Sequence, residues 1–296
     1  MTDHFIGVDV GTGSARAGVF DAAGTLLMSA KHDIDMHRAP NGIVEQSSAQ
    51  VWDAVCRATR KAVADAAIDP VSVRGIGFDA TCSMVVRGRD GQPLAVGDLA
   101  HPERDIIVWM DHRAIEQAER INADKHEVLT YVGGVISPEM QTPKLMWLKE
   151  NRNETYEAAG HFFDLTDFLG WKATGSTARS SCTVTCKWTY LAHENRWDGA
   201  YFRAIGLGDL ADEEFVRIGQ DIVAPGTALG AGLTEGAASQ LGLVAGTAVA
   251  AGLIDAHAGG VGTVSAEGGA KYAASSLAYV FGTSSCTMTT TRDPAF

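Results

Sequence analysis

The chain lacks the features that mark several classes of protein. Its five cysteines are an odd number without a C-x-x-C pair, so neither a disulfide framework nor a zinc ribbon is indicated, and we interpret them as small buried thiols. Lys and Arg total 24 against 36 Asp and Glu, and the net charge of −12 would repel a nucleic-acid backbone and an anionic lipid surface alike. Nucleic acid and membrane are therefore not expected as partners.

Long hydrophobic runs are also missing. No basic segment followed by an apolar one opens the chain, and the longest apolar and small-residue run, Val244 to Ile254, is well short of the ~20 residues of a spanning helix. We predict a cytoplasmic protein. The 296 residues are 46% hydrophobic and 20% charged, which excludes disorder, coiled coil and collagen and suffices for about two domains.

Strand and helix patterns alternate along the first half of the chain, which predicts the α/β class. Residues 5–10, 15–20 and 25–30 have the pattern of a three-stranded meander, and apolar spacing from Ser48, with Ser47 or Ser48 as N-cap, indicates a helix. Further buried strands are predicted over 73–78, 106–110 and 247–254. Two hairpins are predicted, one over 83–86 with 94–96 and one over 278–281 with 286–291.

The middle of the sequence is more helical and rich in aromatic residues. Thr142 and Pro143 predict the N-cap and first residue of a helix over 144–150, and a second helix over 166–173 should end at Gly175. We expect the aromatic side chains here to form core, and only secondarily a surface on which a sugar could stack. A short capped helix is predicted over 234–241.

Two segments, 8–14 and 280–285, repeat one device: an apolar strand, a Gly-Thr turn with small hydroxyl residues, and another strand. Glycine lets a backbone approach an anion, and successive N–H groups with hydroxyls can hold phosphate oxygens. A single such turn is most often only a tight turn, but the duplication predicts a polyphosphate held from both sides. No Walker lysine motif or dinucleotide fingerprint is present, which disfavours those two nucleotide-binding classes.

Acidic residues accompany these turns. Asp9 could hold Mg²⁺ through its waters, although taken alone it is more readily explained as a hydrogen-bond acceptor at a strand end. Asp79, Asp111 and Asp255 each follow a predicted buried strand, where α/β proteins bind ligands, but caps or loop acceptors explain the first two equally well. Phosphoryl transfer needs one carboxylate to take the proton of the attacking hydroxyl, and we choose Asp255 because its neighbours are small. His257 could also act as a general base, but a lone histidine is more often a structural residue.

Five ordered motifs match a known family. Residues 5–16, 109–114, 142–151, 252–259 and 282–286 together resemble the FGGY carbohydrate kinases, and more narrowly their ribulokinase and D-ribulose kinase branch. The resemblance implies an α/β, actin-like, ribonuclease H-like fold of two domains, with ATP and sugar between them. The first domain would be complete over 1–254, and the second only begun over 255–296.

The resemblance also implies roles for individual residues. Asp255 would be the general base, and Asp9 with Asp255 would surround the Mg²⁺ of ATP. The transferring phosphoryl would lie between the two turns, and the sugar against one side of the cleft. The turn residues would be Gly11, Thr12, Gly13, Gly282, Thr283 and Ser284, and the sugar contacts Ala80, Thr81, Asp111, Lys187 and Asp255.

Departures from other branches narrow the expected substrate. Where Ala80-Thr81 stands here, glycerol kinases have an Arg-Glu pair and xylulokinases a Gln-Met-His stretch, so the resemblance favours D-ribulose, phosphorylated at its C5 hydroxyl. Two alternatives remain open: a non-catalytic sugar-binding fragment without the adenine-binding half, and an actin-like ATPase. The hairpin over 278–291 would leave an unpaired sheet edge, so we expect either a fragment or a homodimer formed through that edge.

Overall fold

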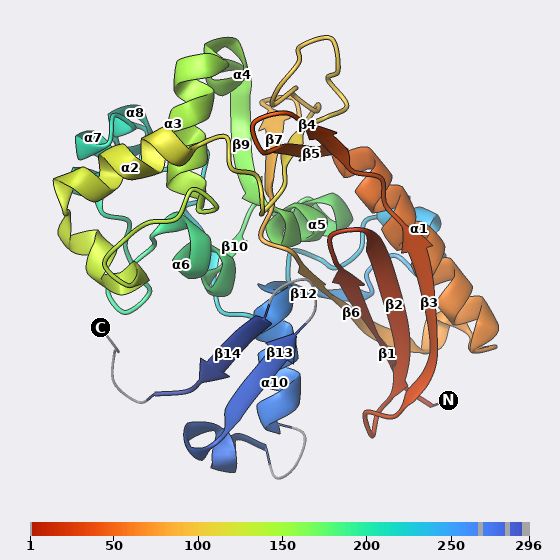
Figure 1. Cartoon of the computed structure of the whole chain (residues 1–296). Coiled ribbons are helices and arrows are strands. Elements are labelled where there is room, and N and C mark those ends of the chain that lie inside the picture. Colours follow the sequence, from red (N-terminus) through yellow and green to blue (C-terminus); the bar gives the residue numbers. More distant parts are fainter. Residues whose placement is uncertain (1, 266–268, 282–284, 292–296) are drawn as a thin grey trace.

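The computed structural model describes residues 2–265, 269–281 and 285–291 (Figure 1). Its first five-stranded sheet has the order β12-β6-β1-β2-β3. The predicted meander is confirmed, because β1, β2 and β3 pair antiparallel, while β6 runs parallel to β1 and β12 parallel to β6. The strands are β1 (His4–Val10), β2 (Ser14–Asp21), β3 (Leu26–Asp33), β6 (Val73–Ala80) and β12 (Ala248–Ile254).

Two helices, α1 (Ser48–Asp65) and α5 (Leu165–Thr174), pack on this sheet, and α9 (Glu235–Leu241) packs on both of them. All three share one hydrophobic core with the sheet. Their ends follow the sequence signals. The Ser47 and Thr234 side chains accept hydrogen bonds from the first turns of α1 and α9, and Gly175 ends α5 in the left-handed conformation. These predictions are confirmed.

The second five-stranded sheet, in the order β4-β5-β8-β7-β9, is antiparallel throughout. Its strand β8 is shorter than predicted, because after Ile107 the chain leaves the ladder and Asp111 N bonds to Val108 O in a turn. The predicted hairpin over 83–86 and 94–96 is short and irregular: Leu94 N donates to Val86 O, Gly88 N donates to Gln92 O, and Arg87 and Pro93 form a bridge. The strands are β4 (His37–Ala39), β5 (Ile43–Gln46), β7 (Met84–Gly88), β8 (Ile106–Ile107) and β9 (Ala159–Asp164).

A group of helices forms the second core with this sheet, and it holds many of the aromatic side chains, as predicted. Helix α3 begins at Gln141 rather than at Lys144, with Pro143 in its first turn. Proline is tolerated there because the first N–H groups of a helix have no partner within it. The helices are α2 (Ile115–Asp124), α3 (Gln141–Asn151), α4 (Asn153–Ala158), α6 (Ser181–Trp188), α7 (Gly199–Ala204) and α8 (Gly208–Asp212).

The last elements lie beyond the end of β12. Helix α10 (Asp255–Ser265) packs on the hairpin of β13 (Leu277–Phe281) and β14 (Ser285–Thr289), which confirms the second predicted hairpin (Figure 1). Within the described residues, no helix is long and apolar enough to cross a membrane. The remaining short elements are β10 (Arg179–Ser180), β11 (Ile222–Val223) and the 3₁₀ turns 70–72, 127–132 and 269–275.

Candidate functional site

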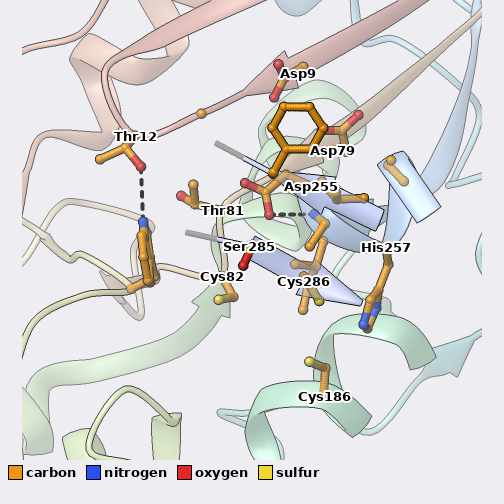
Figure 2. A pocket seen from close by; sticks show the side chains of 18 of the residues that line it. Asp9, Thr12, Asp79, Thr81, Cys82, Cys186, Asp255, His257, Ser285 and Cys286 are labelled. Carbon is orange, nitrogen blue, oxygen red and sulfur yellow. Dashed lines mark hydrogen bonds between the residues drawn. The ribbon is translucent and has the colours of Figure 1, made fainter. Parts of the chain in front are cut away.

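A cavity of about 920 Å³ lies where β1, β6 and β12 end, between the first sheet, α6 and the β13–β14 hairpin (Figure 2). The carboxyl ends of parallel strands are where open α/β sheets bind ligands, as the sequence predicted. Side chains from distant parts of the chain meet here, among them Asp9, Thr12, Asp79, Thr81, Trp109, Glu139, Cys186, Lys187, Asp255, His257 and Cys286.

Three carboxyl groups gather at one end of this cavity (Figure 2). Asp9 and Asp79 face each other across the parallel β1–β6 ladder, and Asp255 follows directly after β12 on the other side of β6. Burial raises the pKa of Asp79 to about 8, and the neighbouring charges of Asp9 and Asp255 act in the same direction. Without a cation nearby, Asp79 is therefore protonated near neutral pH.

Asp255 is the first residue of α10, and its Oδ1 accepts a hydrogen bond from Ala256 N at 2.7 Å. Burial raises the pKa of Asp255, the bond from Ala256 opposes that shift, and the charge of Asp9 adds to it. A carboxylate with a raised pKa takes up a proton more readily than an exposed one, which suits a general base.

The first glycine turn, 11–13, is held in place from several sides. Gly11 N donates to Ser14 O at 3.0 Å, and the side-chain amide of Gln46 donates to Thr12 O at 2.8 Å. A Cβ added at Gly13 would meet no atom within 4 Å, so the bare backbone faces open space. The turn fits phosphate oxygens because its main chain is both fixed and accessible.

The other end of the cavity carries a cation among thiols and hydroxyls. Burial alone would lower the pKa of Lys187, but nearby Cys82, Cys186 and Glu139 raise it overall, so its ammonium group stays charged. Thr81 Oγ1 lies 3.1 Å from Ser83 Oγ and lines the same wall. Ammonium and hydroxyl groups are suitable partners for the hydroxyls of a sugar.

The structure brings most of the predicted site residues together. Asp9, the turn 11–13, Thr81, Lys187 and Asp255 all line the one cavity. Ala80 does not: it is fully buried in β6, between Val10 of β1 and Ile254 of β12. The predicted second turn, Gly282, Thr283 and Ser284, lies outside the described residues.

Asp111 was expected to contact the sugar, but the structure does not place it among the residues that line the cavity. It follows β8 of the second sheet, and its fully buried carboxylate accepts bonds from Val44 N at 2.6 Å and from two guanidinium nitrogens of Arg113 at 2.8 and 2.9 Å. Arg113 is bound in turn by Glu45 at 2.8 Å. These bonds occupy both oxygens, so Asp111 serves the interior of the fold.

Other residues of the cavity were missed by the sequence reasoning. Cys82, Cys186 and Cys286 line it, although only Cys82 and Cys56 are fully buried among the cysteines, so the interpretation of all five as buried thiols was wrong. The positions of Cys82 and Cys186, next to Thr81 and Lys187, were a usable signal. Glu139 gave no signal, because it is a single acid in a loop, and His257 lines the cavity with Nδ1 3.0 Å from Cys182 Sγ.

Comparison with known proteins agrees with this geometry. The FGGY family of carbohydrate kinases, N-terminal domain, matches residues 4–262. A human FGGY carbohydrate kinase domain-containing protein is 50% identical over 99% of this chain and 54% of its own length, and a D-ribulokinase of Saccharomyces cerevisiae is 41% identical over 81% and 35%.

The fold is shared as well. The crystal structure of gluconate kinase from Lactobacillus acidophilus has a TM-score of 0.74 at 17% identity, over 89% of this chain and 51% of that one. The chain thus spans about half the length of the human protein and of the gluconate kinase, and about a third of the yeast D-ribulokinase. Its α/β fold is the actin-like N-terminal domain of such kinases. By its sequence over residues 4–262 and by this fold, the chain belongs to the FGGY family of carbohydrate kinases.

Proposed function

We propose that this chain takes part in the ATP-dependent phosphorylation of a pentulose, D-ribulose at its C5 hydroxyl. The observation that carries the proposal is the single cavity that joins a bare glycine turn, the carboxylate of Asp255 and the ammonium of Lys187. Relatives in the family include a D-ribulokinase and ribulokinases, which supports a pentulose over other sugars.

The residues present suit a magnesium nucleotide. Within the part of the chain that the structure describes, no three His, Cys, Asp or Glu side chains form a metal site by themselves. Magnesium usually keeps several waters and is bound by one or two carboxylates together with substrate phosphates, and Asp9 and Asp255 would supply that pair. The bound nucleotide supplies the phosphoryl group, and the turn 11–13 would offer the N–H groups of Thr12 and Gly13 to the phosphate oxygens, since that of Gly11 already donates to Ser14 O.

The protein's own part in the reaction is to orient the sugar and to move one proton. Lys187 and Thr81 would hydrogen-bond the hydroxyls of the pentulose and direct its C5 hydroxyl toward Asp255. Asp255 then takes the proton of that hydroxyl. At the same time the hydroxyl oxygen forms a bond to phosphorus, and the bond between phosphorus and the leaving ADP breaks. The raised pKa of Asp255 favours this proton transfer.

Coupled measurement of ADP formation by the 296-residue chain, with Mg²⁺ and a panel of D-ribulose, L-ribulose, D-xylulose, ribitol and glycerol, tests the proposal. We expect turnover with D-ribulose above all others. Sugar-independent ATP hydrolysis would instead favour an ATPase. If no sugar of the panel gave ADP formation but D-ribulose still bound in calorimetry, the result would support the alternative function, a non-catalytic sugar-binding fragment.

A further inference from the structure

Trp109 connects the glycine turn 11–13 to Ser83 and Lys144 through hydrogen bonds. Its indole Nε1–H donates to Thr12 Oγ1 at 3.1 Å, the dashed line from Thr12 in Figure 2. Its backbone N–H donates to Ser83 Oγ at 3.1 Å, and its carbonyl accepts from Lys144 Nζ at 3.2 Å. Lys144 is fully buried, so its side chain has little freedom to move. Both polar groups of the Trp109 backbone are thus hydrogen-bonded, and this fixes the part of the main chain from which the indole extends.

The direction of the indole bond decides what the Thr12 hydroxyl can do. An indole N–H is only a donor, so Thr12 Oγ1 must accept, and its own hydrogen stays available for another partner. The main chain of Thr12 is held as well, because its carbonyl accepts from Gln46 Nε2 at 2.8 Å. Thr12 lines the cavity beside Gly11 and Gly13. The remaining O–H is therefore free to donate into the space where the turn exposes its backbone.

We propose that Trp109 is a positioning residue for phosphoryl transfer, whose indole N–H holds the Thr12 hydroxyl as a donor to a phosphate oxygen of the nucleotide. This rests on the part of the proposed function that puts a nucleotide in the cavity, and on no particular sugar. Donors that are oriented before the anion arrives stabilise it more than donors that must first turn away from other partners. A hydrogen bond to a charged group changes affinity about 10- to 100-fold.

Calorimetric titration with MgADP measures the effect in the wild type, Trp109→Phe, Thr12→Val and the double variant. We expect Thr12→Val to weaken binding about tenfold or more, because the donor is lost. Trp109→Phe keeps an aromatic ring but frees the hydroxyl to rotate, and it should weaken binding about three- to tenfold. The double variant should bind no more weakly than Thr12→Val, because Trp109 acts through Thr12. Thr12→Ser should restore most of the affinity.

A spectroscopic readout separates positioning from a general loss of structure. The chain has six tryptophans, and the indole N–H resonance of Trp109 is the one missing in Trp109→Phe. This resonance should shift when MgADP is added to the wild type. In Thr12→Val it should already be displaced without ligand, and MgADP should move it little.

Trp52→Phe is the matched control, because the Trp52 indole donates to Gln240 Oε1 at 2.5 Å, outside the residues that line the cavity. It should lower stability and leave MgADP affinity unchanged. Equal MgADP affinity in wild type, Trp109→Phe and Thr12→Val would overturn the inference and leave the proposed function standing. Absence of MgADP binding to the wild type would overturn both. The expected MgADP results without phosphorylation of any ketopentose would overturn the proposed function alone.

Discussion

The two ends of the cavity differ in the sign of their charge: one gathers carboxyl groups, and the other holds an ammonium group among thiols. At one end Asp9 and Asp79 lie on the adjacent strands β1 and β6, and Asp255 directly follows β12, the other neighbour of β6. Burial with mutual repulsion raises the pKa of Asp79 and Asp255. At the other end Lys187 lies near thiols that burial keeps neutral, with the pKa of Cys82 raised to about 12 and that of Cys186 to about 11. The acidic end therefore favours a cation or a proton, whereas the thiol end leaves its ammonium available for neutral hydroxyls.

Replacing Asp255 by Asn should have the largest effect of any single substitution in the cavity. The amide cannot take the proton of the attacking hydroxyl, so turnover with D-ribulose should fall about 100- to 10,000-fold. The measurement is the rate of ADP formation at saturating sugar and MgATP. Asp53→Asn, on the exposed surface of α1, is the control and should keep the wild-type rate. Turnover of Asp255→Asn within a factor of ten of the wild type would show that another group is the base.

Asp111→Asn tests whether that acid belongs to either end of the cavity. Loss of the carboxylate charge leaves the buried Arg113 with Glu45 as its one remaining ion-pair partner among the described residues, which should lower the free energy of unfolding by about 3 kcal/mol. Urea denaturation measures this, and calorimetry should show D-ribulose affinity unchanged under native conditions. Asp212→Asn, at an exposed ion pair with Arg203, should change stability by less than about 1 kcal/mol. A selective loss of sugar affinity in Asp111→Asn would restore the role that the family resemblance implied.

Lys187→Met probes the thiol end. Methionine keeps much of the side-chain length but removes the ammonium, so D-ribulose should bind about 10- to 100-fold more weakly while MgADP affinity stays the same. Both affinities can be measured by calorimetry on the same preparation, with the exposed Lys61→Met as control. Weakened MgADP binding with unchanged sugar binding would mean that the two ends have been assigned the wrong way round.

The sequence predicted well what depends on local pattern. Strand periodicity, glycine turns and caps such as Ser47 and Thr234 act within a few residues, so the first sheet with its helices and the acidic end of the cavity could be placed in advance. The same local view favoured Asp255 over Asp111 because the neighbours of Asp255 are small, but it kept both as candidates for the ligand site, since both follow apolar segments. Only the three-dimensional packing shows that one is enclosed by Arg113 and Val44 and the other faces the cavity.

The thiol end was largely invisible for a related reason. Its residues come from loops and helix faces far apart in sequence, and they meet only because α6 packs near the end of β12. Lys187 was identified through the family resemblance, and Cys82 and Cys186 could have been found beside Thr81 and Lys187, but Glu139 carries no local pattern. The hydrogen bond between Trp109 and Thr12 spans 97 positions and could not be inferred from either segment alone.

Asp79→Asn should produce the smallest effect, and it isolates the electrostatics of the acidic end. In the folded chain the pKa of Asp79 is raised to about 8 from the ordinary 3.8, so between these values the unfolded state has lost a proton that the folded state keeps. The free energy of unfolding of the wild type therefore contains a contribution that is complete below about pH 4 and is lost as the pH rises to about 8. The side-chain amide of the Asp79→Asn variant does not titrate, so the free energy of unfolding of this variant does not fall for this reason as the pH rises.

Between pH 5 and pH 7, in the presence of a chelator, the wild type should accordingly lose up to about 2 kcal/mol more stability than Asp79→Asn. Urea denaturation at several pH values measures the difference, and Asp53→Asn should follow the wild-type curve. Parallel curves for wild type and Asp79→Asn would show that Asp79 is ionised throughout this range. The acidic end would then hold its three charges without help from a proton, and its contrast with the thiol end would lie in the sign of the charge alone.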